Sequence, residues 1–255
     1  MQNLTYGSLD VTIGNDSAAI GDLAANDFAA TAAALLEDRA EISVIMSTGN
    51  SQRDFYEALV ARDDIDWSRI TVMHVDEYLG VSPDRPESTT WRMRSGIVDR
   101  VHPRAFHAID GEGAPEEEIA RYSRLLEELP PSICILGVGE NGHVAFNDPP
   151  ADFDTRELVI QVSLSDASKR QIVGEGRFAN PGDVVPDDAL TLTVFALLRP
   201  DHVIVIVPDA RKAVAIQATL EGPIAPSCPA SILRSVDGAR MYLDQDSSAL
   251  LEARR

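Results

Sequence analysis

Cysteine, lysine and long apolar runs are scarce in this chain of 255 residues. The two cysteines, Cys134 and Cys228, form neither a disulfide framework nor a metal-ligand spacing, so we expect buried or partly buried thiols and no metal site. No apolar run approaches the roughly 20 residues that cross a bilayer, and no basic segment followed by an apolar core opens the chain. We therefore expect a soluble, cytoplasmic protein with no membrane partner.

Positive charge is also in short supply. The chain has 22 lysines and arginines against 41 acidic residues, which gives a net charge of −19 and a pI near 4.5. Such a field repels nucleic acid and anionic membranes, so we expect neither as a partner. Lys169 and Lys212 are the only lysines, which makes both positions worth examining.

Apolar periodicity alternates between strand and helix along most of the chain. We predict strands at 11–13, 42–46, 70–75, 132–136, 158–162, 203–207 and 239–243. We predict helices at 17–36, 55–60, 89–98, 116–128, 190–198, after 208–210 and at 246–251. This order predicts an α/β fold, a single domain over residues 1–255 with an open, mainly parallel, Rossmann-like sheet and helices on both faces.

A glycine-rich turn follows one of the predicted strands. Residues 137–148 read Gly-Val-Gly-Glu-Asn-Gly-His-Val-Ala-Phe-Asn-Asp, directly after the apolar run 133–136. Glycines let a backbone approach a substrate closely, and histidine is the side chain suited to proton transfer near neutral pH. Asp148 is close enough in sequence to orient His143. The segment therefore predicts an acid/base site at the carboxyl end of a strand, where ligands collect in open α/β sheets.

Two simpler interpretations of this turn must be weighed. Gly137, Gly139 and Gly142 fit the dinucleotide-binding pattern Gly-x-Gly-x-x-Gly. That pattern requires a long helix after the third glycine, and Pro149-Pro150 prevents such a helix. The other interpretation is a tight turn with a surface histidine, which the turn by itself does not exclude.

A second strand end has the features of an anion site. Ser47-Thr48-Gly49-Asn50-Ser51 connects the strand at 42–46 to a helix. Unpaired N–H groups at such a helix start and the helix dipole favour an anion at the same place. An ordinary N-cap by Ser51 or Asn50 accounts for the same residues, so the turn alone leaves both interpretations open.

Polar groups follow two more of the predicted strands. Asp76 comes after the strand at 70–75, and Lys212 comes after the strand at 203–207. Because parallel strands end at one edge of a sheet, we expect these groups and the two turns to converge. The sequence thus predicts one site that combines carboxylates, an imidazole and a cation.

Taken together, these segments resemble the glucosamine-6-phosphate deaminase and 6-phosphogluconolactonase superfamily over nearly the whole chain. The matching segments are the phosphate turn at 47–51, the catalytic-base segment at 76–80 with 86–88, the ring-opening loop at 137–149, Arg177-Phe178, 189–191 and 211–213. Superfamily lactonases typically carry Asp-Glu-Arg where this chain has Asp76-Glu77-Tyr78, and they differ from 145–149 after the Gly-His. The resemblance is therefore closer to the deaminase branch.

The deaminase branch implies conversion of an amino-sugar phosphate, glucosamine 6-phosphate, to a ketose phosphate, fructose 6-phosphate, with loss of ammonia and without cofactor or metal. It implies Asp76 as the general base, with a pKa raised by burial or by Glu77. His143 would move protons during ring opening, with Asp148 selecting its tautomer and Asn141 nearby. The residues implied in substrate and phosphate binding are Thr48, Gly49, Asn50, Ser51, Glu77, Gly142, Arg177 and Lys212. Arg177 lies in the polar stretch 174–183, which resembles a lid.

Two departures from the family pattern bear on the activity. The first position of the ring-opening motif, often aspartate, is Asn141, and the usual glutamate before the proline is Asp148. The shorter carboxylate reaches about 1.5 Å less far, so we expect a slower reaction than in a typical deaminase. A lactonase, an enzyme for another hexosamine phosphate and a non-catalytic sugar-phosphate-binding regulator remain as alternatives. The sequence leaves the exact sugar and a homo-oligomer open.

Overall fold

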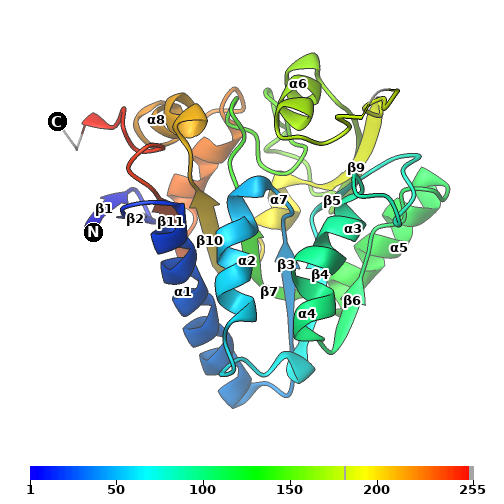
Figure 1. Ribbon diagram of the computed structural model, residues 1–255, viewed down its shortest axis with the longest axis horizontal. Helices are drawn as coiled ribbons and strands as arrows, with labels where there is room; N and C mark the ends of the chain where they lie inside the picture. Colours follow the sequence, from blue (N-terminus) through cyan, green and yellow to red (C-terminus); the bar gives the residue numbers. More distant parts are fainter. Residues whose placement is uncertain (181, 253–255) are drawn as a thin grey trace.

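The computed structural model describes residues 1–180 and 182–252, and its strands form two sheets (Figure 1). The large sheet has the order β1 (Gln2–Tyr6), β2 (Leu9–Ile13), β11 (Ala239–Leu243), β10 (His202–Val207), β7 (Pro131–Leu136), β3 (Ile42–Met46), β4 (Ile70–His74) and β6 (Ala105–His107). All of its pairs are parallel except β1 with β2. The small antiparallel sheet has the order β5 (Asp76–Tyr78), β9 (Asp188–Leu192) and β8 (Val159–Ser163).

Helices cover both faces of the large sheet, which confirms the predicted fold class (Figure 1). One face packs against α1 (Ser17–Asp38), α2 (Arg53–Val60), α3 (Thr89–Met93) and its continuation through η3 (Arg94–Val98) and α4 (Asp99–Val101). The other packs against α5 (Pro115–Glu128), α7 (Val194–Leu197), α8 (Ala213–Glu221) and η5 (Pro229–Ser235). Short turns η1 (Asn50–Gln52), η2 (Trp67–Arg69) and η4 (Ala210–Lys212) and helix α6 (Asp166–Gly174) complete the elements.

Local sequence explains the central elements. Every residue of β3 and of β4 is buried, as expected for parallel strands covered on both faces. Helix α1 begins where the Asp16 carboxylate accepts a hydrogen bond from the N–H of Ala19 (2.9 Å). Its buried face is rich in alanine, which brings the helix close to the sheet.

Two predicted helices are wrong. Residues 190–198 contain the end of β9 and the short α7, because the backbone of 188–192 pairs with both β5 and β8. Residues 246–251 form turns, which begin where Asp244 accepts the Ser247 N–H (2.7 Å). The short strands β1, β5 and β6 and the helix α6 were not predicted, because each has too few residues or too little apolar periodicity.

The four predicted strand ends belong to neighbours in the large sheet. The order β10, β7, β3, β4 places all four carboxyl ends side by side. From β3 the chain continues outward to β4 and β6, whereas β7 returns to the opposite side of β3 and leads on to β10. This reversal makes the β3/β7 boundary a topological switch point, where open α/β sheets bind ligands.

Candidate active site

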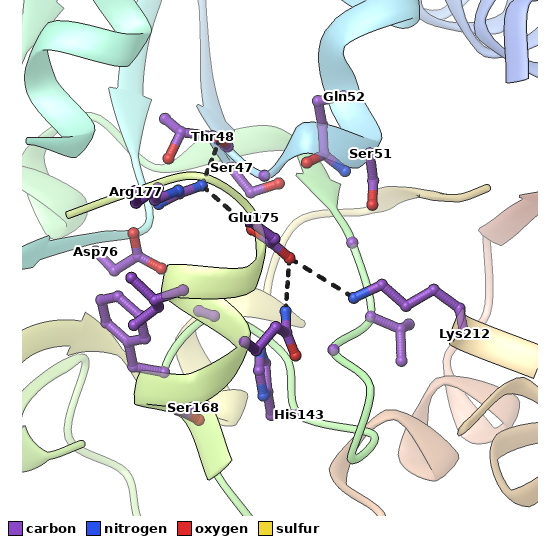
Figure 2. A pocket seen from close by; sticks show the side chains of 18 of the residues that line it. Ser47, Thr48, Ser51, Gln52, Asp76, His143, Ser168, Glu175, Arg177 and Lys212 are labelled. Atoms are coloured by element: carbon purple, nitrogen blue, oxygen red, sulfur yellow. Dashed lines mark hydrogen bonds and ion pairs between the residues drawn. The ribbon is translucent and has the colours of Figure 1, made fainter. Parts of the chain in front are cut away.

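A pocket opens at this switch point and brings most of the predicted residues together (Figure 2). Its walls come from the turns after β3, β4, β7 and β10 and from the segment that begins with α6. The predicted residues that line it are Thr48, Gly49, Ser51, Asp76, His143, Arg177 and Lys212. The predicted convergence of the strand ends is thus confirmed.

Asp76 lies where the chain passes from the large sheet to the small one. It starts β5 and pairs with Thr191 of β9, and its carbonyl oxygen accepts a hydrogen bond from the Thr89 hydroxyl. The residue is 8% exposed. Burial raises the pKa of Asp76 to about 7, the positive charge of Arg177 works against this rise, and Glu77 adds to it. This side chain can therefore exist as either acid or base near neutral pH.

Glu77, which the sequence predicts as a binding residue, does not line the pocket. Its carboxylate accepts four hydrogen bonds, from the N–H groups of Tyr78, Thr89 and Thr90 and from the Ser88 hydroxyl (2.7–3.0 Å). These donors belong largely to the start of α3, where a carboxylate is favoured by the unpaired N–H groups. Glu77 therefore fixes α3 against β5, and alternation along β5 places Asp76 and Glu77 on opposite sides.

His143 and its partners form a second group in the turn after β7. The Nδ1 atom of His143 lies 3.1 Å from Oδ1 of Asp148. Asn141 donates to Asp148 (3.1 Å), and its Oδ1 accepts from the backbone N–H of His143 (3.1 Å). Because Nδ1 faces the carboxylate, Nε2 is the ring nitrogen left for a substrate. Asn141 and Asp148 thus lie behind His143 rather than in the wall of the pocket.

Asp148 is held as an anion despite its partial burial. Burial favours the neutral form, but hydrogen bonds from His143, Ser168 and Ser165 outweigh it and hold the pKa of Asp148 well below its usual range. The Ser165 and Ser168 hydroxyls come from the start of α6 and lie 2.6–2.7 Å from the carboxylate. The distance of 3.1 Å to His143 shows that the missing methylene does not put Asp148 out of reach.

Glycines allow the tight path of the ring-opening loop. A Cβ atom on Gly139 would come within 2.3–2.4 Å of the His143 ring, so only glycine fits there. Gly142 has a φ of +85° and packs on Cys228, and its carbonyl oxygen accepts from Ala230 (2.9 Å). Residues 143–158, all described, contain no helix, which excludes the dinucleotide interpretation.

Two buried cations form the other end of the pocket. Lys212 lies in η4, after β10, and is 4% exposed. Arg177 follows α6 and donates to the carbonyl oxygen of Thr48 (2.9 Å) and to the Tyr78 hydroxyl (3.3 Å). Burial lowers the pKa of Lys212, and Glu175 is the largest opposing influence. The two buried cations thus place positive charge in the same pocket as the phosphate turn at 47–51.

Asn50 has a different place from the one predicted. Its amide nitrogen donates to the carbonyl oxygen of Glu175 (3.1 Å), and its amide oxygen accepts from Arg92 (2.9 Å). The side chain therefore connects the segment after α6 to α3 and does not line the pocket. Of the lid-like stretch 174–183, residue 181 lies outside the described residues.

The structure adds pocket residues that sequence reasoning missed. Gln52 is buried next to Gly49 and donates to the carbonyl oxygen of Leu136 (3.1 Å). Ser168, Gln171 and Glu175 enter from α6 and its C-terminal end. The flanking glycines of Gly-Glu-Gly at 174–176 were an available signal of a turn, but nothing local indicated that it faces the pocket.

Within residues 1–180 and 182–252, no group of three or more His, Cys, Asp or Glu side chains could hold a metal ion. None of the described helices combines the length and apolar character needed to cross a bilayer.

Comparison with known proteins places the chain in a family. Residues 15–242 match the family described as glucosamine-6-phosphate isomerases/6-phosphogluconolactonase. The chain belongs to this family. A glucosamine-6-phosphate deaminase from Exiguobacterium sibiricum is 33% identical over 217 residues, which are 84% of each chain. A glucosamine-6-phosphate deaminase from Listeria innocua is 31% identical over 209 residues, 81% of this chain and 86% of the relative.

Solved structures of this glucosamine-6-phosphate isomerase/6-phosphogluconolactonase family share the fold. A monomeric glucosamine-6-phosphate deaminase superposes with a TM-score of 0.85 and 25% identity, covering 94% of this chain and 99% of the other. A 6-phosphogluconolactonase from Thermotoga maritima has a TM-score of 0.73 and 20% identity, covering 92% and 98%. The second likeness concerns the fold alone.

Proposed function

We propose that the chain converts an amino-sugar 6-phosphate and water to a ketose 6-phosphate and ammonia, with glucosamine 6-phosphate and fructose 6-phosphate as the substrate and product. The observation that carries this proposal is the position of Asp76, a carboxyl with a pKa of about 7, in the same pocket as His143 and two buried cations. Proton transfer between neighbouring carbons requires a base of this kind. The relatives named as deaminases support the choice of substrate.

His143 serves ring opening in this proposal. The Asp148 carboxylate beside Nδ1 favours a proton on that nitrogen, so Nε2 takes the proton from the anomeric hydroxyl and returns it to the ring oxygen. The bond between C1 and the ring oxygen breaks, and C1 becomes an aldehyde. The negative charge of Asp148 stabilises the imidazolium that forms between the two transfers.

Asp76 serves the isomerisation step. Its ionised carboxylate removes the proton from C2, and the carboxylic acid that results returns a proton to C1. In the same transfer the C1 aldehyde oxygen takes up a proton and becomes a hydroxyl, and the amino nitrogen gives up a proton, so the C2–nitrogen bond becomes an imine. Water then adds to C2, and ammonia leaves as the ketone forms. A carboxyl whose pKa lies near the working pH performs both halves of this transfer well.

The phosphate group of the substrate binds the protein but takes no part in the reaction. Lys212, Arg177 and the phosphate turn line the same pocket as His143. Figure 2 shows the two cations on either side of Glu175, with Arg177 next to Asp76. Binding energy from a group that does not react can position C1 and C2 of the substrate next to Asp76 and His143. Local positive charge also offsets the repulsion of a phosphate dianion by a chain of net charge −19.

The deciding experiment measures ammonia and ketose 6-phosphate from purified protein supplied with glucosamine, galactosamine and mannosamine 6-phosphates. Hydrolysis of 6-phosphogluconolactone is measured in parallel. We expect ammonia and fructose 6-phosphate in equal amounts from glucosamine 6-phosphate and little lactone hydrolysis. Rapid lactone hydrolysis without ammonia would overturn the proposal, and sugar-phosphate binding with neither activity would identify a regulator.

A further inference from the structure

The cation end of the pocket already holds an anion that belongs to the chain. Figure 2 shows the carboxylate of Glu175 between Lys212 and Arg177. Its Oε1 lies 3.9 Å from Nζ of Lys212, and its Oε2 lies 4.0 Å from Nη2 of Arg177. The side chain is 11% exposed, so this carboxylate occupies the interior of the site and not its rim.

Glu175 neutralises the two cations but satisfies them poorly. Charge-assisted hydrogen bonds from nitrogen to a carboxylate measure about 2.7–2.9 Å, and both distances here are about 1 Å longer. Among the residues that the structure describes, Ser47 Oγ and Arg177 Nε are buried without a hydrogen-bond partner, and Nζ of Lys212 makes only the 3.9 Å ion pair with Glu175. The site thus retains donors that a carboxylate does not use and that a phosphate, with more oxygens, could.

Glycines flank Glu175 on both sides and leave open space around it. Gly174 and Gly176 flank it at the C-terminal end of α6, and Gly176 has a φ of +83°. A Cβ atom at either glycine would meet nothing within 4 Å, so no packing requires glycine there. Glu175 is retained in the pocket chiefly by Gln171, whose amide donates to Oε1 (2.8 Å) and accepts from the Glu140 N–H (3.0 Å). Besides the two long ion pairs, one amide therefore holds the carboxylate in place.

We propose that Glu175 is an internal competitor for the phosphate group and sets how strongly the pocket binds sugar phosphates. Without substrate, its carboxylate balances the charges of Lys212 and Arg177. A substrate phosphate replaces this carboxylate, and the Glu175 side chain rotates out of the pocket between its flanking glycines. The inference rests on the proposed function only in taking the incoming anion to be the phosphate of a sugar phosphate.

The test compares wild-type protein with Glu175→Gln, an isosteric change that keeps an acceptor for Gln171 and removes the charge. The probe is inorganic phosphate, with the Kd measured by calorimetry and by the shift in Tm at rising phosphate. We expect phosphate to bind roughly 5- to 20-fold more tightly to the variant, as one partly buried charge is removed beside the bound anion. With glucosamine 6-phosphate, we expect the fall in KM to exceed any change in kcat.

Asp166→Asn is the matched control, because it removes the same charge from the exposed start of α6, outside the pocket. Its phosphate Kd should stay within about twofold of wild type, because screening weakens distant exposed charges. If Glu175→Gln folds with an unchanged or weaker affinity for phosphate, the inference is wrong. Tighter phosphate binding together with no deamination by wild type would retain the inference and reject the proposed function.

Discussion

Asp76 and Asp148 are two carboxylates of one site with opposite electrostatics. Asp76 is buried beside Glu77, and its pKa is raised to about 7. Asp148 receives hydrogen bonds from Asn141 and from two serines of α6 in addition to its contact with His143, and its pKa is depressed. The same type of side chain thus has two roles. Asp76 is a carboxyl that can exchange protons, and Asp148 is a carboxylate that stays charged.

The difference between them lies in hydrogen-bond donors and, to a lesser degree, in depth, because Asp76 is buried and Asp148 is half-buried. Donors stabilise the charged form, so a carboxylate with several of them remains ionised even when it is partly buried. Among the described residues, no donor is within hydrogen-bond distance of the Asp76 carboxylate, and desolvation dominates there. Two titratable groups whose pKa values are displaced in opposite directions mark separate roles, here base and orienting anion.

The largest expected effect comes from Asp76→Asn. The amide keeps the shape of the side chain but cannot accept a proton, so we expect kcat for deamination to fall by roughly 10³- to 10⁴-fold. Affinity for fructose 6-phosphate, measured by calorimetry, should remain within a few-fold. Substantial turnover by the purified variant would remove Asp76 from the role of base.

Asp148→Asn should have a smaller effect on the same reaction. The variant loses the charge that stabilises protonated His143 and selects its tautomer, so we expect kcat/KM to fall about 10²- to 10³-fold. An open-chain substrate analogue should be partly spared, because it does not need ring opening. The exposed Asp154→Asn serves as the charge control, and equal losses on closed-ring and open-chain compounds would contradict the assignment.

The same two variants should change stability in opposite directions at pH 8. Because the pKa of Asp76 is raised in the folded state, this group stabilises the protein at low pH, and the stabilisation is lost as the pH rises through about 7. At pH 8 the wild-type protein therefore carries the free-energy cost of an ionised, buried Asp76. Asp76→Asn should gain about 2–4 kcal/mol there by removing this cost. Asp148 has the reverse sign, because its depressed pKa stabilises the fold above the ordinary carboxyl range. Asp148→Asn should lose about 1–3 kcal/mol in denaturant unfolding. Changes of the same sign in the free energy of unfolding of the two variants would refute the comparison.

The pH profile of wild type should report Asp76 and not Asp148. Because the base must be ionised, kcat/KM should rise about tenfold per pH unit below a midpoint near 7 and level off above it. The depressed pKa of Asp148 places its titration below the range in which activity is measured. A profile that is flat between pH 5 and 8 would show that the ionisation of Asp76 does not control the rate.

Ser168→Ala gives the smallest expected effect and tests how Asp148 is held. Removal of one of its donors should reduce kcat/KM by about three- to tenfold, the equivalent of one ordinary hydrogen bond, because the other donors remain. Ser168→Thr, which keeps the hydroxyl, should recover part of the loss. If both variants match wild type in steady-state kinetics, Ser165 and Asn141 suffice to hold the carboxylate.

Much of the site was predictable because its motifs are local. The phosphate turn, Asp76, the ring-opening loop and Lys212 each follow directly after a strand, and parallel strands bring such ends to one edge. The wrong helix at 190–198 has a different cause. Its apolar residues suit a helix equally well, and pairing with β5 and β8 decided in favour of a strand.

The amino-acid sequence by itself determined the central strands of the large sheet, most of the helices that cover it and the residues that meet at its carboxyl edge, because periodicity and chain order act over short distances. Only the tertiary structure decided where side chains point. Glu77 faces the start of α3, Asn50 joins the segment after α6 to Arg92, and Glu175 enters the cation end of the pocket. Each of these directions depends on donors or charges brought from distant parts of the chain. The pKa values of Asp76 and Asp148 have the same origin, since desolvation and hydrogen bonding exist only once those parts have packed together.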